Sequence, residues 1–374
     1  MYFNTGSGKL PKKIDILLIT TTIFLTLLGF LMSYSATFYK FSIHGTSTIK
    51  FLTREFFRLL IGIIAFFVGK SINPKLYRKY TKPAVVALLA VLILTFLLGV
   101  KRLGAIRWIR LGFLSFQPSE LAKLVLVLYL ADALSSSRES LKNFKELLKV
   151  LVVPVLIFGL VAIQPNLSTA MIIFFITVGI LYIAGLKFHY ILIPILSGFA
   201  LAVFFMFAVP GKFSHVKSRI TRFVQGNEHY QVKQARIAIS QGGLFGKGIG
   251  KGTQKYLFLP YAENDFMFAL VAEELGLFWA TILILAYALI TIKGLFIAER
   301  HIKAKYYYSL LSAGVSLMIF TSSAVHIAVN LGLIPPTGQT LPLLSVGGSS
   351  LMVNLFALGM LEYLSEDAER YEVI

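Results

Sequence analysis

Residues Leu257–Gly276 read LFLPYAENDFMFALVAEELG and join a long polar segment to an apolar run long enough to cross a bilayer. We expect Asn264 to cap the helix and Asp265 to lie in its first turn, where the helix dipole favours an ionised carboxylate. Glu273 and Glu274 follow about 12–14 Å further along the same helix. Acids within a membrane helix indicate a functional site, or else bundle-facing groups bonded to their neighbours.

The composition is that of a polytopic membrane protein. Of the 374 residues, 57% are hydrophobic and 14% are charged, and the mean hydropathy is +0.78. Soluble domains are nearer 45–50% apolar, and here the apolar residues fall in blocks of about 20. The blocks predict an all-α bundle of about ten transmembrane helices that forms a single domain over residues 1–374. Cysteine is absent, which excludes disulfides, thiolate metal sites and a cysteine nucleophile.

The loop charges predict the orientation of the bundle. The net charge is +19, and the short loops after the even-numbered spans carry many of the basic residues, which favours a cytoplasmic location for these loops. Both termini are then cytoplasmic, and one long extracytoplasmic loop, residues 211–264, lies between spans 7 and 8. That loop and residues 101–120 are also basic, which indicates either an anionic ligand at the outer face or contact with lipid phosphates. No nucleic-acid partner is expected, because no basic soluble module of domain size is present.

Residues 101–120, KRLGAIRWIRLGFLSFQPSE, supply the first candidate ligands. Arg107 and Arg110 suit a bidentate grip on phosphate or carboxylate. Glu120 and Lys123 are three residues apart, so they are neighbours on one helix face and are expected to pair. A structural ion pair explains these two residues as well as a ligand site does.

Two glycine-rich segments interrupt the apolar pattern. Residues 242–252, GGLFGKGIGKG, do not fit the phosphate-binding pattern G-x-x-x-x-G-K-[ST], because glycine follows both lysines. We expect a tight backbone bend near the membrane surface instead. Residues 335–350 are rich in Pro, Gly and Ser, which allows a non-helical segment beside the bundle, tolerated only where it is buried in protein or lines a cavity. The alternative is an ordinary solvated turn.

Five segments together resemble one family, the SEDS polymerases (shape, elongation, division and sporulation). The segments are RWIRLGFLSFQPSELAK, QPNLSTA, GGLFGKGIGKGTQKYLFLP, NDFMFALVAEELG and TGQTLPLLSVGGSSLMVNLFALGML. Their order and spacing agree with the family, and the motifs look closer to its division member FtsW than to its elongation member RodA. The chain departs from the family pattern at Asn166, commonly Asp, at Val346, usually Tyr, and at Glu263-Asn264, commonly His-Thr.

The resemblance implies a multi-pass peptidoglycan glycosyltransferase of the bacterial inner (cytoplasmic) membrane. Such an enzyme polymerises lipid II, a disaccharide-pentapeptide on undecaprenyl pyrophosphate, at the outer face for cell division or cell shape. The family's essential Asp falls on Asp265, which we interpret as the general base for the acceptor hydroxyl. The candidate substrate-binding residues are Arg107, Arg110, Glu120, Lys123, Arg219, Arg222 and Glu274.

The resemblance also implies partners, namely a class B penicillin-binding protein transpeptidase and other divisome or elongasome membrane proteins. The sequence specifies no cofactor and leaves the need for a divalent cation open. Two other classes of function also remain open. One is a transporter that flips lipid II, for which broken segments and buried acids are typical. The other is a non-enzymatic scaffold that recruits a division partner.

Overall fold

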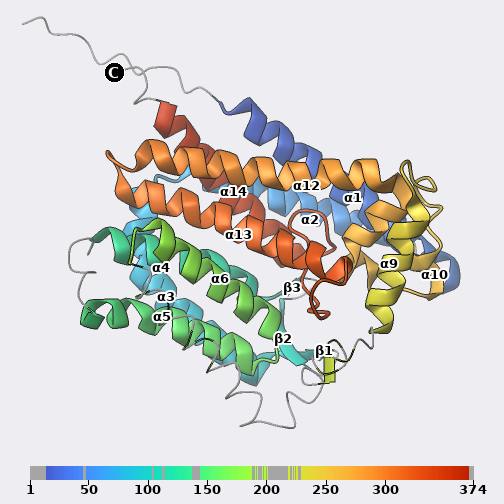
Figure 1. The fold of residues 1–374 in the computed structure, drawn as a ribbon, viewed down its shortest axis with the longest axis horizontal. Helices are drawn as coiled ribbons and strands as arrows, with labels where there is room; N and C mark the ends of the chain where they lie inside the picture. Colours follow the sequence, from blue (N-terminus) through green and yellow to red (C-terminus); the bar gives the residue numbers. More distant parts are fainter. Residues whose placement is uncertain are drawn as a thin grey trace, which may run out of the picture.

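The computed structural model describes residues 14–44, 48–102, 105–111, 114–136, 144–187 and 229–369, together with scattered positions between 190 and 225. Helices dominate these residues and lie side by side in one bundle (Figure 1). The longer helices are α1 (Ile16–His44), α2 (Thr48–Ser71), α3 (Pro74–Leu98), α4 (Pro118–Ser136), α5 (Phe144–Ile163), α6 (Leu167–Ile183), α9 (Tyr230–Gly242), α12 (Met267–His301), α13 (Tyr306–Asn330) and α14 (Gly348–Glu369). Two single-turn helices, α10 (Gln254–Leu257) and α11 (Ala262–Asp265), lie between α9 and α12.

Five of the described helices, α1, α3, α5, α12 and α13, are long and apolar enough to cross a membrane. The apolar helix α6 is shorter. Large hydrophobic side chains such as Leu97 and Val86 are exposed on the outside of the bundle, as lipid contact requires. The prediction of a mostly helical membrane protein is therefore confirmed. The count of ten spans stays a prediction, because most of the seventh span and of residues 211–228 lies outside the described residues.

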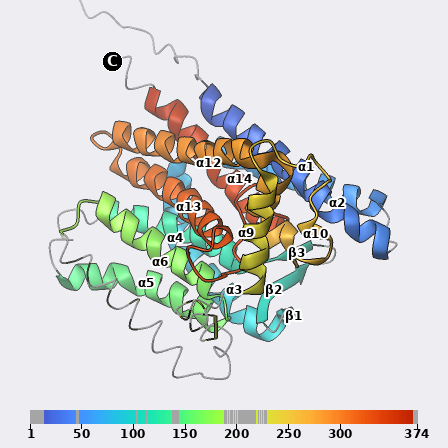
Figure 2. The ribbon, with the colours of Figure 1, turned by 45° about the vertical axis from the view of Figure 1, so that its right-hand side comes forward.

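The first and last described helices meet at one end of the bundle. The backbone N–H of Asp15 donates to Glu362 Oε1 at 3.0 Å, and Asp15 Oδ2 accepts from Ser365 Oγ at 3.0 Å and from Lys293 Nζ at 3.2 Å. The small sheet, α9 and α10 lie away from these chain ends in both views (Figures 1 and 2). An even number of crossings, as predicted, would place the two ends together in this way. Which side of the membrane they occupy remains a prediction.

A small antiparallel sheet follows α3 and corrects the all-α prediction. Its strands are β1 (Val100–Arg102), β2 (Ala105–Leu111) and β3 (Leu114–Phe116), in the order β1-β2-β3. Trp108 pairs with Val100 of β1, and Arg110 pairs with Ser115 of β3. The sequence AIRWIRL of β2 is rich in β-branched and aromatic residues, which favour strands. A search of the sequence for apolar blocks long enough to span a membrane does not detect strands this short.

Glycines let α2 and α14 pack closely. A Cβ atom on Gly69 would lie 2.2 Å from the carbonyl oxygen of Phe356, and one on Gly359 would lie 2.0 Å from that of Phe66. Any larger residue at either position would push the two backbones apart. Small residues at helix contacts are the usual means of association where lipid removes the hydrophobic driving force.

Candidate active site

Asp265 is the last residue of α11, just before α12 begins at Met267. Phe266, with φ −130° and ψ 30°, separates the two helices. The short helix α11 starts after Tyr261, which has φ 61° and whose carbonyl accepts the N–H groups of Asn264 and Asp265, both at 3.0 Å. The prediction that Asn264 caps the long helix and that Asp265 lies in its first turn was therefore wrong, because both residues belong to the short helix α11 that precedes it.

The carboxyl group of Asp265 is partly buried, and its surroundings bring its pKa close to neutral pH. Burial, with the nearby charge of Glu263, raises the pKa of Asp265 to about 6, while Arg219 and Arg107 act in the opposite direction. Asp265 is still mostly ionised at pH 7, as expected, but burial rather than the helix dipole determines its pKa. A carboxylate with such a pKa can accept and release a proton near neutral pH.

Two arginines from distant segments lie near this carboxylate. Arg107, on β2, donates from Nε to the carbonyl of Gln164 at 3.2 Å, and Arg219 donates from Nη1 to the carbonyl of Pro336 at 3.1 Å. Burial and the charge of Arg219 lower the pKa of Arg107 to about 10, and Asp265 opposes this shift. Arg107 is therefore charged at neutral pH. The structure thus brings three of the predicted site residues together.

The segment between α13 and α14, residues 331–347, is non-helical and covers the same carboxylate. A Cβ atom on Gly338 would lie 3.6 Å from Asp265 Oδ2. The ring nitrogen Nδ1 of His326 contacts the carbonyl of Gln339 at 2.7 Å, and Leu341 is buried. Of the two alternatives for this segment, the buried non-helical path is correct, and the solvated turn is not.

The expected pair of Glu120 and Lys123 is present on α4. Lys123 Nζ lies 3.0 Å from Glu120 Oε2, and both side chains are buried. Neither of these two atoms has a hydrogen bond to another group in the described part of the chain. Ser119, which precedes Glu120 in α4, accepts a hydrogen bond from Asn166 Nδ2 at 2.9 Å, so the amide at this position holds the start of α6 against α4. The ion pair retains unused hydrogen-bonding capacity in a buried place.

A second buried ion pair, on α2, was not identified from the sequence. Arg58 contacts Glu55 in an ion pair, and neither oxygen of Glu55 nor Arg58 Nε has a hydrogen-bond partner among the described residues. A Cβ atom on Gly348 would lie 3.6 Å from Arg58 Cδ, so the pair reaches the start of α14. The available signal was the spacing of three residues within an apolar run, which is also the spacing of Glu120 and Lys123.

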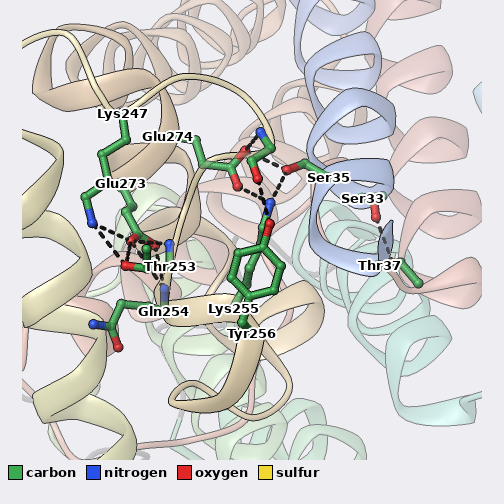
Figure 3. Close-up of polar contacts among 11 residues, drawn as sticks. Ser33, Ser35, Thr37, Lys247, Thr253, Gln254, Lys255, Tyr256, Glu273 and Glu274 are labelled. Atoms are coloured by element: carbon green, nitrogen blue, oxygen red, sulfur yellow. Dashed lines mark hydrogen bonds and ion pairs between the residues drawn. The ribbon is translucent and has the colours of Figure 1, made fainter. Parts of the chain in front are cut away.

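Glu273 and Glu274 fold the glycine-rich loop after α9 (Figure 3). Glu273 Oε1 accepts from the N–H of Thr253 at 2.8 Å and from Lys247 Nζ at 3.0 Å. Glu274 accepts from Lys255 Nζ at 2.5 Å, from Ser35 Oγ at 2.6 Å and from the N–H of Gly250 at 2.9 Å. Both carboxylates are fully buried. Glu274, a predicted substrate ligand, thus has the contacts of the alternative, an acid bonded to its neighbours.

The same loop meets a kink in α12. Gly276 has φ 88° and ψ 175°, and a Cβ atom there would lie 2.4 Å from the backbone nitrogen of Gly246. The N–H groups of Lys247 and Gly248 donate to the carbonyls of Glu273 and Glu274 at 3.0 and 2.9 Å. The loop therefore satisfies carbonyls that the kink removes from the helix. The predicted tight bend is present, and it is bound to α12.

The remaining candidates lie elsewhere. Arg110 is exposed on β2, where the alternation of a strand directs it to the face opposite Arg107. Arg222 lies outside the described residues. The described part of the chain holds no cluster of three or more His, Asp or Glu side chains placed to bind a metal ion. The described candidate site therefore centres on Asp265, Arg107 and Arg219.

The fold and the site define a class of protein. It is a polytopic helical membrane protein in which a carboxylate with a pKa near neutrality lies near two arginines and beneath a buried non-helical segment. The chain belongs to the FtsW/RodA/SpoVE family of cell cycle proteins, whose family model matches residues 15–370. This confirms the resemblance drawn from the sequence motifs.

Individual relatives match over nearly the whole chain. A probable peptidoglycan glycosyltransferase FtsW of Francisella salina is 32% identical over 372 residues, which covers 96% of this chain and 91% of that protein. A structure reported under "Structural coordination of polymerization and crosslinking by a peptidoglycan synthase complex" has a TM-score of 0.75 at 26% identity and covers 95% of this chain and 98% of the other. The crystal structure of the rod shape determining protein RodA of Thermus thermophilus has a TM-score of 0.70 at 27% identity, with coverage of 95% and 97%.

Proposed function

We propose that this protein is a peptidoglycan glycosyltransferase that polymerises lipid II at the outer face of the bacterial inner membrane. One observation carries the proposal: a carboxylate with a pKa of about 6 lies near two half-buried arginines, whose charges act on it. Such a site can remove a proton and neutralise a departing anion in the same step. The names of the relatives support this assignment.

In the proposed step, Asp265 takes the proton from the 4-hydroxyl of the acceptor sugar as that oxygen attacks the anomeric carbon of the donor. The new glycosidic C–O bond forms while the bond from that carbon to the pyrophosphate oxygen breaks. The bonding electron pair leaves with undecaprenyl pyrophosphate. Arg107 and Arg219 stabilise the charge that develops on the leaving group. A separate acid is unnecessary, because a neutralised pyrophosphate is already a good leaving group.

The other polar groups have supporting roles in this proposal. Lys123, whose ammonium has unused hydrogen-bonding capacity, contacts a phosphate, and Glu120 holds it in position. Arg110 and Arg222 attract the anionic head group at the outer face. Glu274 acts indirectly, because it anchors the loop that packs on α12.

The test is Asp265→Asn, measured for polymerisation and for lipid II binding on the same purified protein. General-base loss removes about 10²–10⁴ in rate, so glycan synthesis should collapse while binding persists. Glu299→Gln, which changes an exposed acid at the far end of α12, should polymerise like the wild type. Substantial polymerisation by Asp265→Asn would sink the assignment. Scrambling of labelled lipid without glycan chains would indicate a flippase, and neither activity would indicate a scaffold.

The proposed orientation and partner have separate tests. Because the chain has no cysteine, single cysteines can report the side of the membrane. Ser240→Cys, on α9, should react with a membrane-impermeant thiol reagent in intact spheroplasts, and Ser136→Cys, at the end of α4, should not; the reverse labelling would overturn the orientation.

The proposed partner is a class B penicillin-binding protein transpeptidase, in line with the similar synthase-complex structure. Failure to co-purify with any such protein of the source organism would count against it.

A further inference from the structure

An open cavity of about 700 Å³ lies between α3, α4 and α5, at the end of these helices away from the sheet. Basic and acidic side chains line it in unequal numbers. The basic ones are Lys75, Arg78, Lys79, Lys82 and Lys149, and the acidic ones are Asp132 and Glu146. The cavity thus has an excess of positive charge and lies apart from the candidate active site.

The basic residues of α3 are placed on one helix face. Lys75, Arg78, Lys79 and Lys82 follow the spacing i, i+3, i+4 and i+7, which brings like charges next to one another. They also occupy the first turns of α3, where the helix dipole disfavours cations, and no acid is present in the first turn. This arrangement opposes the stability of the empty protein, and a bound anion would offset it.

Internal pairs use only part of this charge. Arg78 donates from Nε to Asp132 Oδ1 and from Nη2 to Ser136 Oγ, each at 2.9 Å, which fixes one wall of the cavity. Lys149 pairs with Glu146 at 2.7 Å. Lys75 and Lys82 are exposed, and in the described part of the chain no carboxylate lies within ion-pair distance of either. Two ammonium groups are therefore available at the rim.

Exposed apolar side chains lie next to the basic ones in the sequences of α3 and α5. Leu76 and Val86 on α3 are 45% and 67% exposed, and Leu148 and Val152 on α5 are 43% and 53% exposed. A ligand with a phosphate and long acyl chains matches this combination of cations and exposed apolar helix faces. The usual excess of positive charge in cytoplasmic loops explains basic residues at this end. It does not explain their arrangement on one helix face around a cavity.

We propose that this cavity is a binding site for the head group of an anionic phospholipid. The phosphate lies between Lys75 and Lys82 of α3 and Lys149 of α5, and the acyl chains follow the exposed faces of α3 and α5. The lipid thereby joins α3 to α5 at an end where like charges otherwise repel. The proposal does not depend on the polymerase activity.

The test compares lipid retention by the full chain in nanodiscs of phosphatidylcholine that contain a fluorescent phosphatidylglycerol. The double variant Lys75→Gln/Lys82→Gln removes the two rim charges. The control, Lys187→Gln/Lys303→Gln, removes two exposed lysines from other turns. At about fivefold per lysine contact, the first variant should retain the anionic lipid about 10- to 30-fold less well, and the control should match the wild type. Phosphatidylglycerol should also raise the thermal unfolding midpoint of the wild type and the control, but not that of the first variant.

Three results would overturn the proposal. Equal loss in both variants would show a diffuse charge effect rather than a site. No preference of the wild type for phosphatidylglycerol over phosphatidylcholine would exclude head-group recognition. Displacement of the lipid by inorganic phosphate at low concentration would assign the cavity to a soluble anion. Circular dichroism of each variant verifies that it is folded, so a binding loss cannot be mistaken for unfolding.

Discussion

Asp265→Asn should stabilise the protein at neutral pH while it abolishes polymerisation. The pKa of this carboxyl is about 6 in the folded protein, against a usual value of 3.8. Below about pH 4 the group is protonated in both the folded and the unfolded chain, and its ionisation has no effect on stability. As the pH rises through 6, the folded protein must ionise it in a partly buried site, and that part of the stability is lost.

The size of the effect follows from the pKa difference. A rise from 3.8 to about 6 is about 2 pKa units, and each unit corresponds to about 1.4 kcal/mol, so ionisation in the folded state costs up to about 3 kcal/mol. Asparagine has nearly the same shape and never ionises. The variant should therefore be more stable than the wild type by up to this amount at about pH 7.5, and the difference should vanish towards about pH 4.

Thermal unfolding of the purified protein in one detergent, repeated across this pH range, measures the difference. The control is again Glu299→Gln, which changes an exposed residue at the far end of α12 and leaves Asp265 in place, so it should unfold like the wild type. If Asp265→Asn is no more stable than the wild type at about pH 7.5, the carboxyl is not held at a cost, and the reasoning from its burial fails.

Three more predictions follow from the same structure. With Asp265 as base and its pKa near 6, polymerisation should fall about tenfold from pH 7 to pH 5, and Glu263→Gln, which removes a charge that raises that pKa, should move this decline to lower pH; an unmoved profile would contradict the electrostatics. Glu120→Ala and Lys123→Ala should each lower stability by about 3–5 kcal/mol, and the double variant should lose less than the sum, so additive losses in thermal unfolding would refute the pairing. Glu274→Gln should expose the loop after α9 to proteases, because it leaves the buried ammonium of Lys255 without a counter-charge. Adding Lys255→Met should restore part of the protection. Equal proteolysis of the wild type and the two variants would refute the anchoring role.

The helical architecture was predictable because a bilayer demands long apolar blocks, and such blocks are visible in composition alone. Asp265 stood out for a related reason, since an acid at the end of a polar loop is rare beside an apolar run. The short helix before it was not predictable, because it depends on the left-handed conformation of Tyr261, a residue type that seldom adopts it. The strands of residues 100–116 were too short to show the alternation of apolar and polar residues that distinguishes a strand from a helix.

The partners of Asp265 were harder to infer than Asp265 itself. Arg107 and Arg219 were named as basic candidates, but only the folded chain shows that both approach the same carboxylate. Glu274 was assigned to substrate because intramembrane acids are often functional, whereas the loop after α9 already supplies its donors. The pair of Glu55 and Arg58 could be predicted from the sequence, since it has the same spacing of three residues as Glu120 and Lys123.

The contact of α2 with α14 has a consequence for biogenesis. A ribosome delivers α2 to the membrane well before α14, so the grooves at Gly62 and Gly69 remain without their partner helix while the helices between them are made. The ion pair of Glu55 and Arg58 on α2 also lacks its neighbour until then, because the start of α14 lies against Arg58. A chain truncated before residue 348 would thus leave the charged pair of α2 without the cover of α14. The packing of α2 is therefore completed only when α14 is inserted.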